Sequence, residues 1–145
     1  MSASASPRPT DAELTILRVL WRQGPSTVRS VHEAIGHGTG YTNVLKLLQN
    51  MTDKGLAQRD ESGRAHVYTA AVEEEHTQRR LLDEFVDRAF GGSARQLVLR
   101  ALGTRGASKQ DLAEIEALLD RIEPEDRVEG DDKGAHQTGR GDGRA

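Results

Sequence analysis

The chain has 145 residues, of which 35% are hydrophobic and 30% charged, a composition typical of one globular domain of ordinary size or two very small ones. It contains no cysteine, which excludes disulfides and thiolate metal ligands and fits a cytoplasmic protein, and no apolar run approaches the ~18 residues that a membrane span needs. A net charge of -3 at first argues against a nucleic-acid partner, but residues 10–70 carry seven Lys and Arg against six Asp and Glu, so any basic surface is local to that half.

The N-terminal arm, residues 1–9, is small and polar and lacks the apolar segment of a secretion signal, so we expect it to be disordered. "TDAE" at residues 10–13 then has the form of a capping box, in which a Thr hydroxyl and a Glu carboxylate accept from free amides at a helix start. A first helix is therefore predicted to begin here and to end at Gly24-Pro25.

A second, short helix is predicted after Ser26 or Thr27, either of which can cap it, and Gly36 ends it. The Gly, His and Thr residues at positions 37–40 predict a turn.

The third helix has its apolar residues at the i, i+3, i+4 and i+7 spacing that defines one buried stripe: Val44, Leu47, Leu48 and Met51. Gly55 ends it. Because the stripe faces the core, we expect Asn43, Lys46 and Asn50 to project to the other side.

Two strands are predicted next, "LAQRD" and "AHVYTA", joined by a loop over residues 61–64 that contains a Gly. Three helices and a hairpin over residues 10–71 predict a winged helix-turn-helix. The expected fold class is mainly α with a small β-hairpin wing, followed by a helical domain.

This architecture gives the polar side of the third helix a function, because the second helix of a helix-turn-helix enters the DNA major groove. Asn can bond adenine through two hydrogen bonds, and Lys can donate to guanine or to phosphate. The candidates for reading bases are Asn43, Lys46, Gln49 and Asn50.

Phosphate contacts are expected from Tyr41 and Thr42, at a helix start where free amides also suit an anion, and from Arg64 and His66 on the hairpin. The full set of basic candidates for phosphate contact is Arg22, Arg29, Lys46, Lys54, Arg59 and Arg64. Two other interpretations stay open. Any amphipathic helix shows solvent a polar face, and winged helices also serve as protein-interaction adaptors.

The second half, residues 72–123, is predicted to be a helical dimerisation domain. Three short helices in about fifty residues cannot enclose much core, because so small a domain leaves much of its apolar surface exposed. A homodimer would cover it, although the stripes could instead fold back on the winged helix. The predicted dimerisation residues are Leu81, Leu82, Phe85, Val86, Phe90, Leu97, Leu112, Ile115, Leu118, Leu119 and Ile122.

Residues 124–145 are rich in Gly, Asp and Glu, and we expect a disordered tail. No HExxH pattern, Gly-rich phosphate loop or nucleophile elbow occurs, so the chain is not expected to be an enzyme or to hold a metal or cofactor. The sequence leaves a small-molecule effector undetermined.

Several linked segments resemble the penicillinase-repressor and methicillin-resistance-regulator family of bacterial transcriptional repressors. They are "TDAELTILRVLW", "YTNVLKLLQNMTDKGL", "GRAHVY" and "FGGSARQLVLRAL". The resemblance spans residues 10 to about 122, and implies a winged-helix DNA-binding domain and a helical dimerisation domain that act as a homodimer on a palindromic operator.

The chain departs from the family pattern at three points. Asn43 and Asn50 stand where the family often has Thr and Arg, so the resemblance does not carry over an operator sequence. The C-terminal cysteine cluster of copper-responsive relatives is absent. Antibiotic-responsive relatives are cleaved at an Asn-Phe bond, and the matching bond here is Arg100-Ala101, so the same protease is not implied.

Overall fold

The computed structural model describes residues 7–36 and 38–122. The chain divides into two compact units, Met1–Ser93 and Ala94–Ala145, which are described separately. The tail predicted over residues 124–145, the first six residues of the arm and residue 37 of the predicted turn lie outside the described residues.

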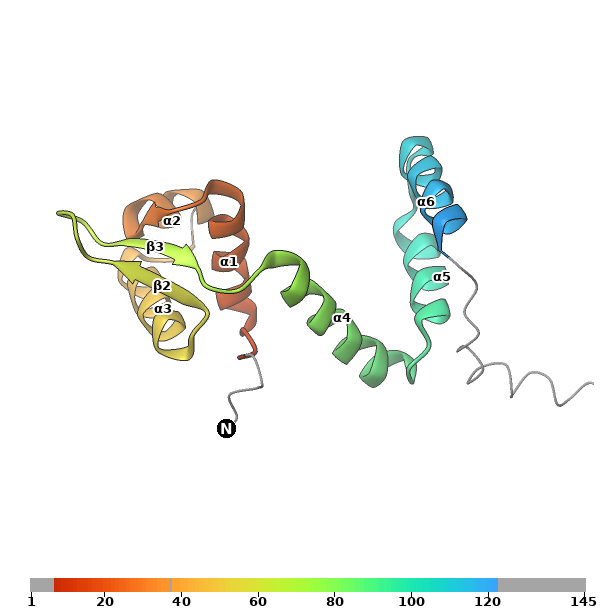
Figure 1. Cartoon of the computed structure of the whole chain (residues 1–145), viewed down its shortest axis with the longest axis horizontal. Coiled ribbons are helices and arrows are strands. Elements are labelled where there is room, and N and C mark those ends of the chain that lie inside the picture. Colours follow the sequence, from red (N-terminus) through yellow and green to blue (C-terminus); the bar gives the residue numbers. More distant parts are fainter. Residues whose placement is uncertain (1–6, 37, 123–145) are drawn as a thin grey trace, which may run out of the picture. The chain divides into compact units, whose positions relative to one another are not determined.

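The first unit has the element order of a winged helix (Figure 1). The predicted fold class, mainly α with a small β-hairpin wing and further helices after it, is confirmed. The elements are α1 (Asp11–Gln23), β1 (Ser26–Thr27), α2 (Val28–Ile35), α3 (Tyr41–Lys54), β2 (Ala57–Asp60), β3 (Val67–Ala70) and α4 (Glu74–Phe90).

The helix boundaries follow the capping residues that the sequence offers. At the start of α1 the Thr10 hydroxyl accepts from the Glu13 amide at 3.1 Å and the Glu13 carboxylate accepts from the Thr10 amide at 3.0 Å, which confirms the capping box. The Thr27 hydroxyl caps α2 by accepting from the Ser30 amide. Gly55 ends α3 in the left-handed region, with φ at 88°.

The sheet has three antiparallel strands in the order β1-β3-β2. The hairpin of β2 and β3 was predicted, but β1 was not. Ser26 and Thr27 were expected only as capping residues, yet they also pair with Tyr68 and Val67. Two residues are too short for an alternating pattern, so their pairing depends on the presence of β3.

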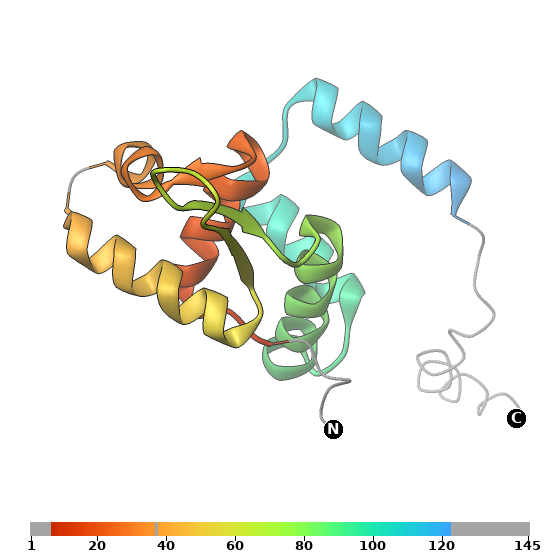
Figure 2. The same cartoon turned by 60° about the vertical axis from the view of Figure 1, so that its left-hand side comes forward.

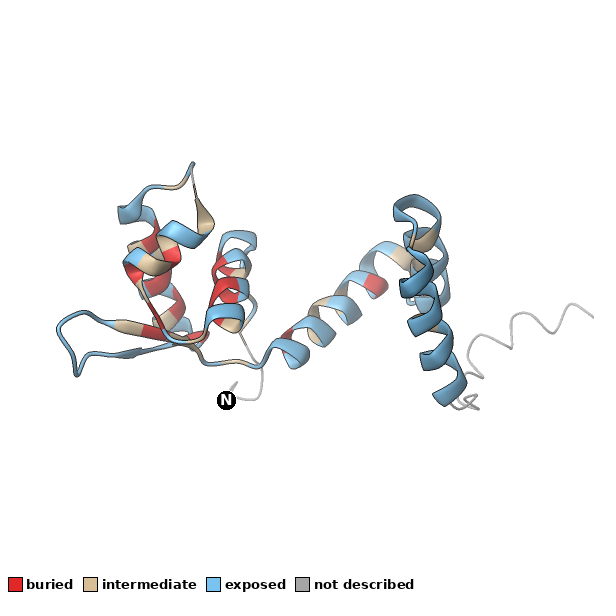
Figure 3. Cartoon of the chain, turned by 90° about the horizontal axis from the view of Figure 1, so that it is seen from above, coloured by how far each residue is buried: buried red, intermediate tan, exposed pale blue. Residues whose placement is uncertain are grey.

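The core lies between α1, α2, α3 and the sheet, and Figure 3 shows the buried residues gathered there. The apolar stripe predicted for the third helix supplies Val44, Leu48 and Met51, all fully buried, whereas Leu47 is half-buried at the margin. Figure 2 shows α3 along one side of this unit, and the loop between β2 and β3 projects beyond the helices in Figure 1.

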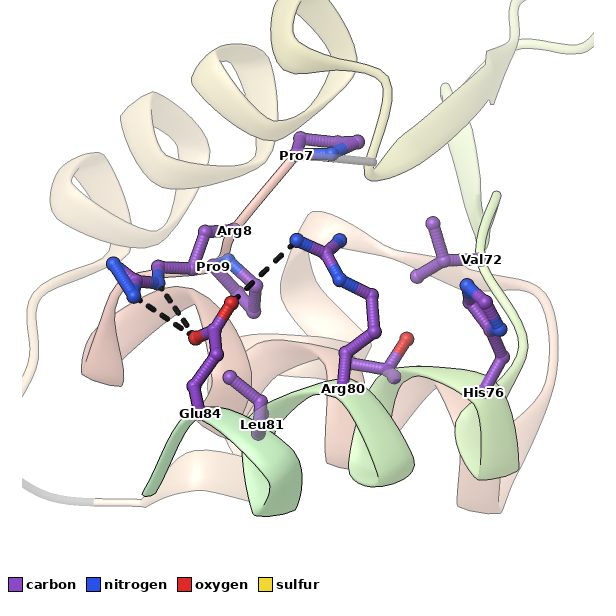
Figure 4. Close-up of a pocket in the computed structure, with 9 residues that line it drawn as sticks. Pro7, Arg8, Pro9, Val72, His76, Arg80, Leu81 and Glu84 are labelled. Carbon is purple, nitrogen blue, oxygen red and sulfur yellow. Dashed lines mark hydrogen bonds and ion pairs between the residues drawn. The ribbon is translucent and has the colours of Figure 1, made fainter. Parts of the chain in front are cut away.

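Within the same unit, α4 is fastened to the residues before α1. Arg8 donates from Nε and Nη2 to one Glu84 oxygen at 3.1 and 2.9 Å, and Arg80 approaches the other oxygen at 3.6 Å (Figure 4). The Trp21 indole donates to the Val72 carbonyl at 3.0 Å. The notch at this contact encloses only about 10 Å³, close to the volume of one water, so it is a packed joint and not a ligand pocket.

The second unit contains α5 (Ala94–Arg105) and α6 (Lys109–Arg121). A capping box at Ser108 opens α6, with the Asp111 amide donating to the Ser108 hydroxyl at 2.9 Å. Neither helix has a buried residue, and both are coloured as largely exposed in Figure 3. None of the described helices is long and apolar enough to cross a membrane.

Candidate nucleic-acid interface

The polar side of α3 is exposed along its whole length. Asn43, Lys46, Gln49 and Asn50 are all exposed, while Val44, Leu48 and Met51 on the other side are buried. The helix therefore holds three carboxamide groups and one ammonium group toward solvent, because packing of the opposite side in the core fixes its orientation. These are side chains that can pair with base edges.

The start of α3 combines exposed hydroxyls with unpaired backbone amides. Tyr41 is 48% exposed and Thr42 is exposed, and the capping residue Gly40 has no side chain that could accept from the first amides. The first amides of a helix lack partners within it, and the helix dipole makes this end favourable for an anion.

A contact that the sequence did not suggest braces this helix start. One ring nitrogen of His32, on α2, lies 2.8 Å from the Thr39 carbonyl oxygen, and its ring meets Tyr41 edge to face with centroids 5.9 Å apart. Because i, i+7 and i+9 spacings across a turn have no sequence signature, periodicity could not have identified His32 as a positioning residue.

The wing presents Arg64 and His66, both exposed, in the loop between β2 and β3, and polar contacts order the start of this loop. The Ser62 amide donates to Asp60 Oδ1 at 2.9 Å, which lowers the pKa of the Asp60 carboxyl. Arg59 pairs with Glu61 at 2.7 Å, so its charge is partly satisfied inside the wing.

Lys54, a predicted phosphate contact, is committed elsewhere in the free protein. Its ammonium lies 2.6 Å from the Glu13 carboxylate, which is 3% exposed. Burial alone would raise the pKa of the Glu13 carboxyl, but the Lys54 ion pair and the hydrogen bonds with Thr10 outweigh it and lower that pKa. Lys54 thus neutralises a buried charge that joins α3 to α1.

The predicted dimerisation residues are mostly accessible on α4, α5 and α6. Val86 is buried within the chain itself, at 8% exposure. Half-buried members are Leu81, Phe90, Leu97 and Ile115, and exposed members are Leu82, Phe85, Leu112, Leu118, Leu119 and Ile122. Large apolar side chains at such exposure form surfaces that other protein can cover.

The chain matches a known family over most of its length. The family described as Penicillinase repressor matches residues 9–121. A penicillinase repressor of Bacillus licheniformis is 22% identical over 116 residues, covering 79% of this chain and 91% of that protein. The transcriptional regulator BlaI of Mycobacterium tuberculosis is 33% identical over 116 residues, covering 74% and 84%. Among solved structures, wild-type MarR from E. coli in its apo form aligns with a TM-score of 0.45 at 14% identity, covering 80% of this chain and 79% of that one.

Proposed function

The chain belongs to the penicillinase repressor family, and from this premise we propose that it represses transcription by binding a palindromic operator in double-stranded DNA as a homodimer. The resemblance carried by its motifs is confirmed. The family is one of transcriptional repressors, which also confirms the prediction that the chain is not an enzyme. We propose a cytoplasmic location as well, because that is where the DNA operator would be found.

The observation that carries this proposal is the exposed polar side of α3. Lys46 has no ion-pair partner among the described residues, so its charge is free to meet a guanine or a phosphate. Asn43 and Asn50, on the same side, offer the paired donor and acceptor that adenine requires. We assign base reading to Asn43, Lys46, Gln49 and Asn50.

Backbone contacts are assigned to the two ends of this surface. Tyr41 and Thr42 offer hydroxyls beside the free amides at the start of α3, and Arg64 and His66 extend from the wing. Such contacts fix the orientation of a protein on the duplex without reading sequence.

Dimerisation is supported by the apolar side chains that α5 and α6 leave in solvent. Leu118, Leu119 and Ile122 are 46, 59 and 53% exposed, and burying such surface against a second copy is favourable. A twofold dimer presents two α3 helices, which fit half-sites about one helical turn of DNA apart or a multiple of that.

A mobility-shift assay on the DNA upstream of the gene tests this function. We expect native protein to shift this DNA, and Lys46→Ala and Arg64→Ala each to weaken binding by about tenfold or more, because each removes a cation from the interface. Arg79→Ala is the matched control, since Arg79 is an exposed arginine of α4 that pairs with Glu75 at 3.3 Å.

The alternative, a winged-helix adaptor that binds protein, gives a different result. An adaptor would show no shift, or the same shift for native protein and for all three variants. Circular dichroism melting of each variant separates lost contacts from lost folding.

A further inference from the structure

An open groove of about 560 Å³ lies between the start of α2, the start of α3 and the wing. This volume is in the range of sites that hold small molecules. The lining residues are Thr27, Val28, Arg29, Tyr41, Leu45, Arg64, Ala65, His66 and Tyr68.

The groove is cationic and its cations are unsatisfied. Arg29 and Arg64 have neither an ion pair nor a hydrogen bond with any residue of the described part of the chain, and no Asp or Glu is among the lining residues described. Two guanidinium groups without partners, one from α2 and one from the wing, therefore line the same groove. The groove is thus locally positive although the net charge of the chain is -3. Such a site favours an anion.

The same groove has apolar walls. Leu45 is half-buried and Tyr41 is 48% exposed, whereas Val28 and Tyr68 are already buried within the protein. The Tyr68 hydroxyl is buried without a well-formed hydrogen bond among the described residues, although it lies near enough to Arg59 to raise the pKa of that guanidinium, together with Glu61. The apolar surface that a ligand could cover is therefore that of Leu45 and Tyr41.

We propose that this groove binds a small organic carboxylate with a flat apolar body. The carboxylate lies between Arg29 and Arg64, and the body covers Leu45 and the ring of Tyr41. Inorganic phosphate or a phosphodiester would satisfy the cations but would bury no apolar surface there. The combination of charge and apolar walls therefore favours the amphiphilic anion.

Occupancy of the groove would also compete with DNA. Tyr41, Arg64 and His66 line the groove and are the residues assigned above to the operator backbone. A carboxylate on Arg64 removes a cation from that interface, so the ligand releases the operator. This second step rests on the proposed function, whereas the binding step does not.

The binding step is tested on the full chain by calorimetry and thermal melting with three probes. Benzoate carries both the charge and the flat body, benzamide has the same shape without charge, and inorganic phosphate has charge without the body. We expect saturable binding and a raised Tm for benzoate only. Three results would each overturn the proposal: benzamide binding as tightly as benzoate, phosphate binding as tightly or more tightly, or no binding of benzoate. A preference for phosphate would identify the groove as a binding site for the DNA backbone.

Variants locate the site. Arg29→Gln should weaken benzoate binding about tenfold by removing a charge-assisted contact. Arg18→Ala is the control, because Arg18 is an exposed arginine of α1 outside the lining set, and it should bind benzoate as native protein does. Unchanged affinity in Arg29→Gln would place the bound probe elsewhere and overturn the assignment.

Competition is measured by adding benzoate or benzamide to the mobility-shift assay. We expect only benzoate to release the DNA, and to do so less effectively for Arg29→Gln. The two failures are distinguishable. DNA binding without benzoate binding overturns this inference and leaves the function, whereas benzoate binding without DNA binding overturns the function and leaves the site.

Discussion

At the scale of single residues, Lys54 was predicted from the sequence to contact DNA, but in the structure it stabilises the fold through an ion pair with Glu13. The sequence places Lys54 near the end of the helix that carries the reading residues, on which basis it was predicted to contact phosphate. In the structure its ammonium lies 2.6 Å from a carboxylate that is 3% exposed. A contact of Lys54 with DNA stays a prediction. Removing the Lys54 side chain is expected to lower the free energy of unfolding, because the ion pair with Glu13 is lost.

Lys54→Ala should therefore destabilise the protein in a pH-dependent way. At neutral pH it leaves the Glu13 carboxylate buried without its cation, which costs about 1–2 kcal/mol in a pair that is partly open to solvent. The folded-state pKa of Glu13 is lowered from its ordinary value of 4.5, so its contribution is present above that value and is lost as pH falls through the folded pKa. The stability difference between native protein and variant should thus shrink between about pH 7 and about pH 3.

Urea unfolding at both pH values measures this difference. Lys46→Ala is the matched control, since Lys46 is an exposed lysine of the same helix without an ion pair among the described residues. A stability difference for Lys54→Ala that is the same at both pH values would contradict the assigned ion pair.

At the scale of elements, short sequence motifs predicted the helix ends that depend only on neighbouring residues. The capping box at Thr10 and the helix end at Gly55 were predicted from motifs of four residues or fewer, and the structure has both. The strand at Ser26 was missed because a distant strand creates it. The contacts of His32 with Thr39 and Tyr41 were missed because they cross a turn. The groove lined by Arg29 was missed because its residues come from α2, α3 and the wing, which only the fold brings together.

Two glycines should respond to alanine with opposite signs. Gly55 ends α3 at a φ of 88°, where a Cβ is strained, so Gly55→Ala should destabilise the protein by about 1 kcal/mol in urea unfolding. Gly103 lies inside α5 with open space around it, so Gly103→Ala should stabilise that helix by about 1 kcal/mol. Slower amide exchange over residues 94–105 would report the second effect, and two changes of the same sign would contradict the backbone conformations.

At the scale of the whole molecule, the sequence predicted where apolar surface lies but not what covers it. Periodicity identified the stripes of α5 and α6, and the structure leaves both helices without a buried residue. Burying exposed leucines at this density against another protein surface is favourable, and a second copy is the simplest partner that supplies such a surface.

Leu119→Glu should separate the copies, because it places a charge at a side chain that is 59% exposed in the single chain and buried in the proposed dimer. Sedimentation should show a native dimer and a variant shifted to monomer, while Gln110→Glu, which adds the same charge to α6 without removing an apolar group, stays dimeric. The operator assay gives an independent measure. A dimer with roughly eight phosphate contacts has a slope of log K against log salt near -7, and a monomer with half as many contacts should show about half that slope. A native protein that sediments as a monomer, or a Leu119→Glu variant that keeps the full slope, would mean that the apolar stripes of α5 and α6 serve another partner.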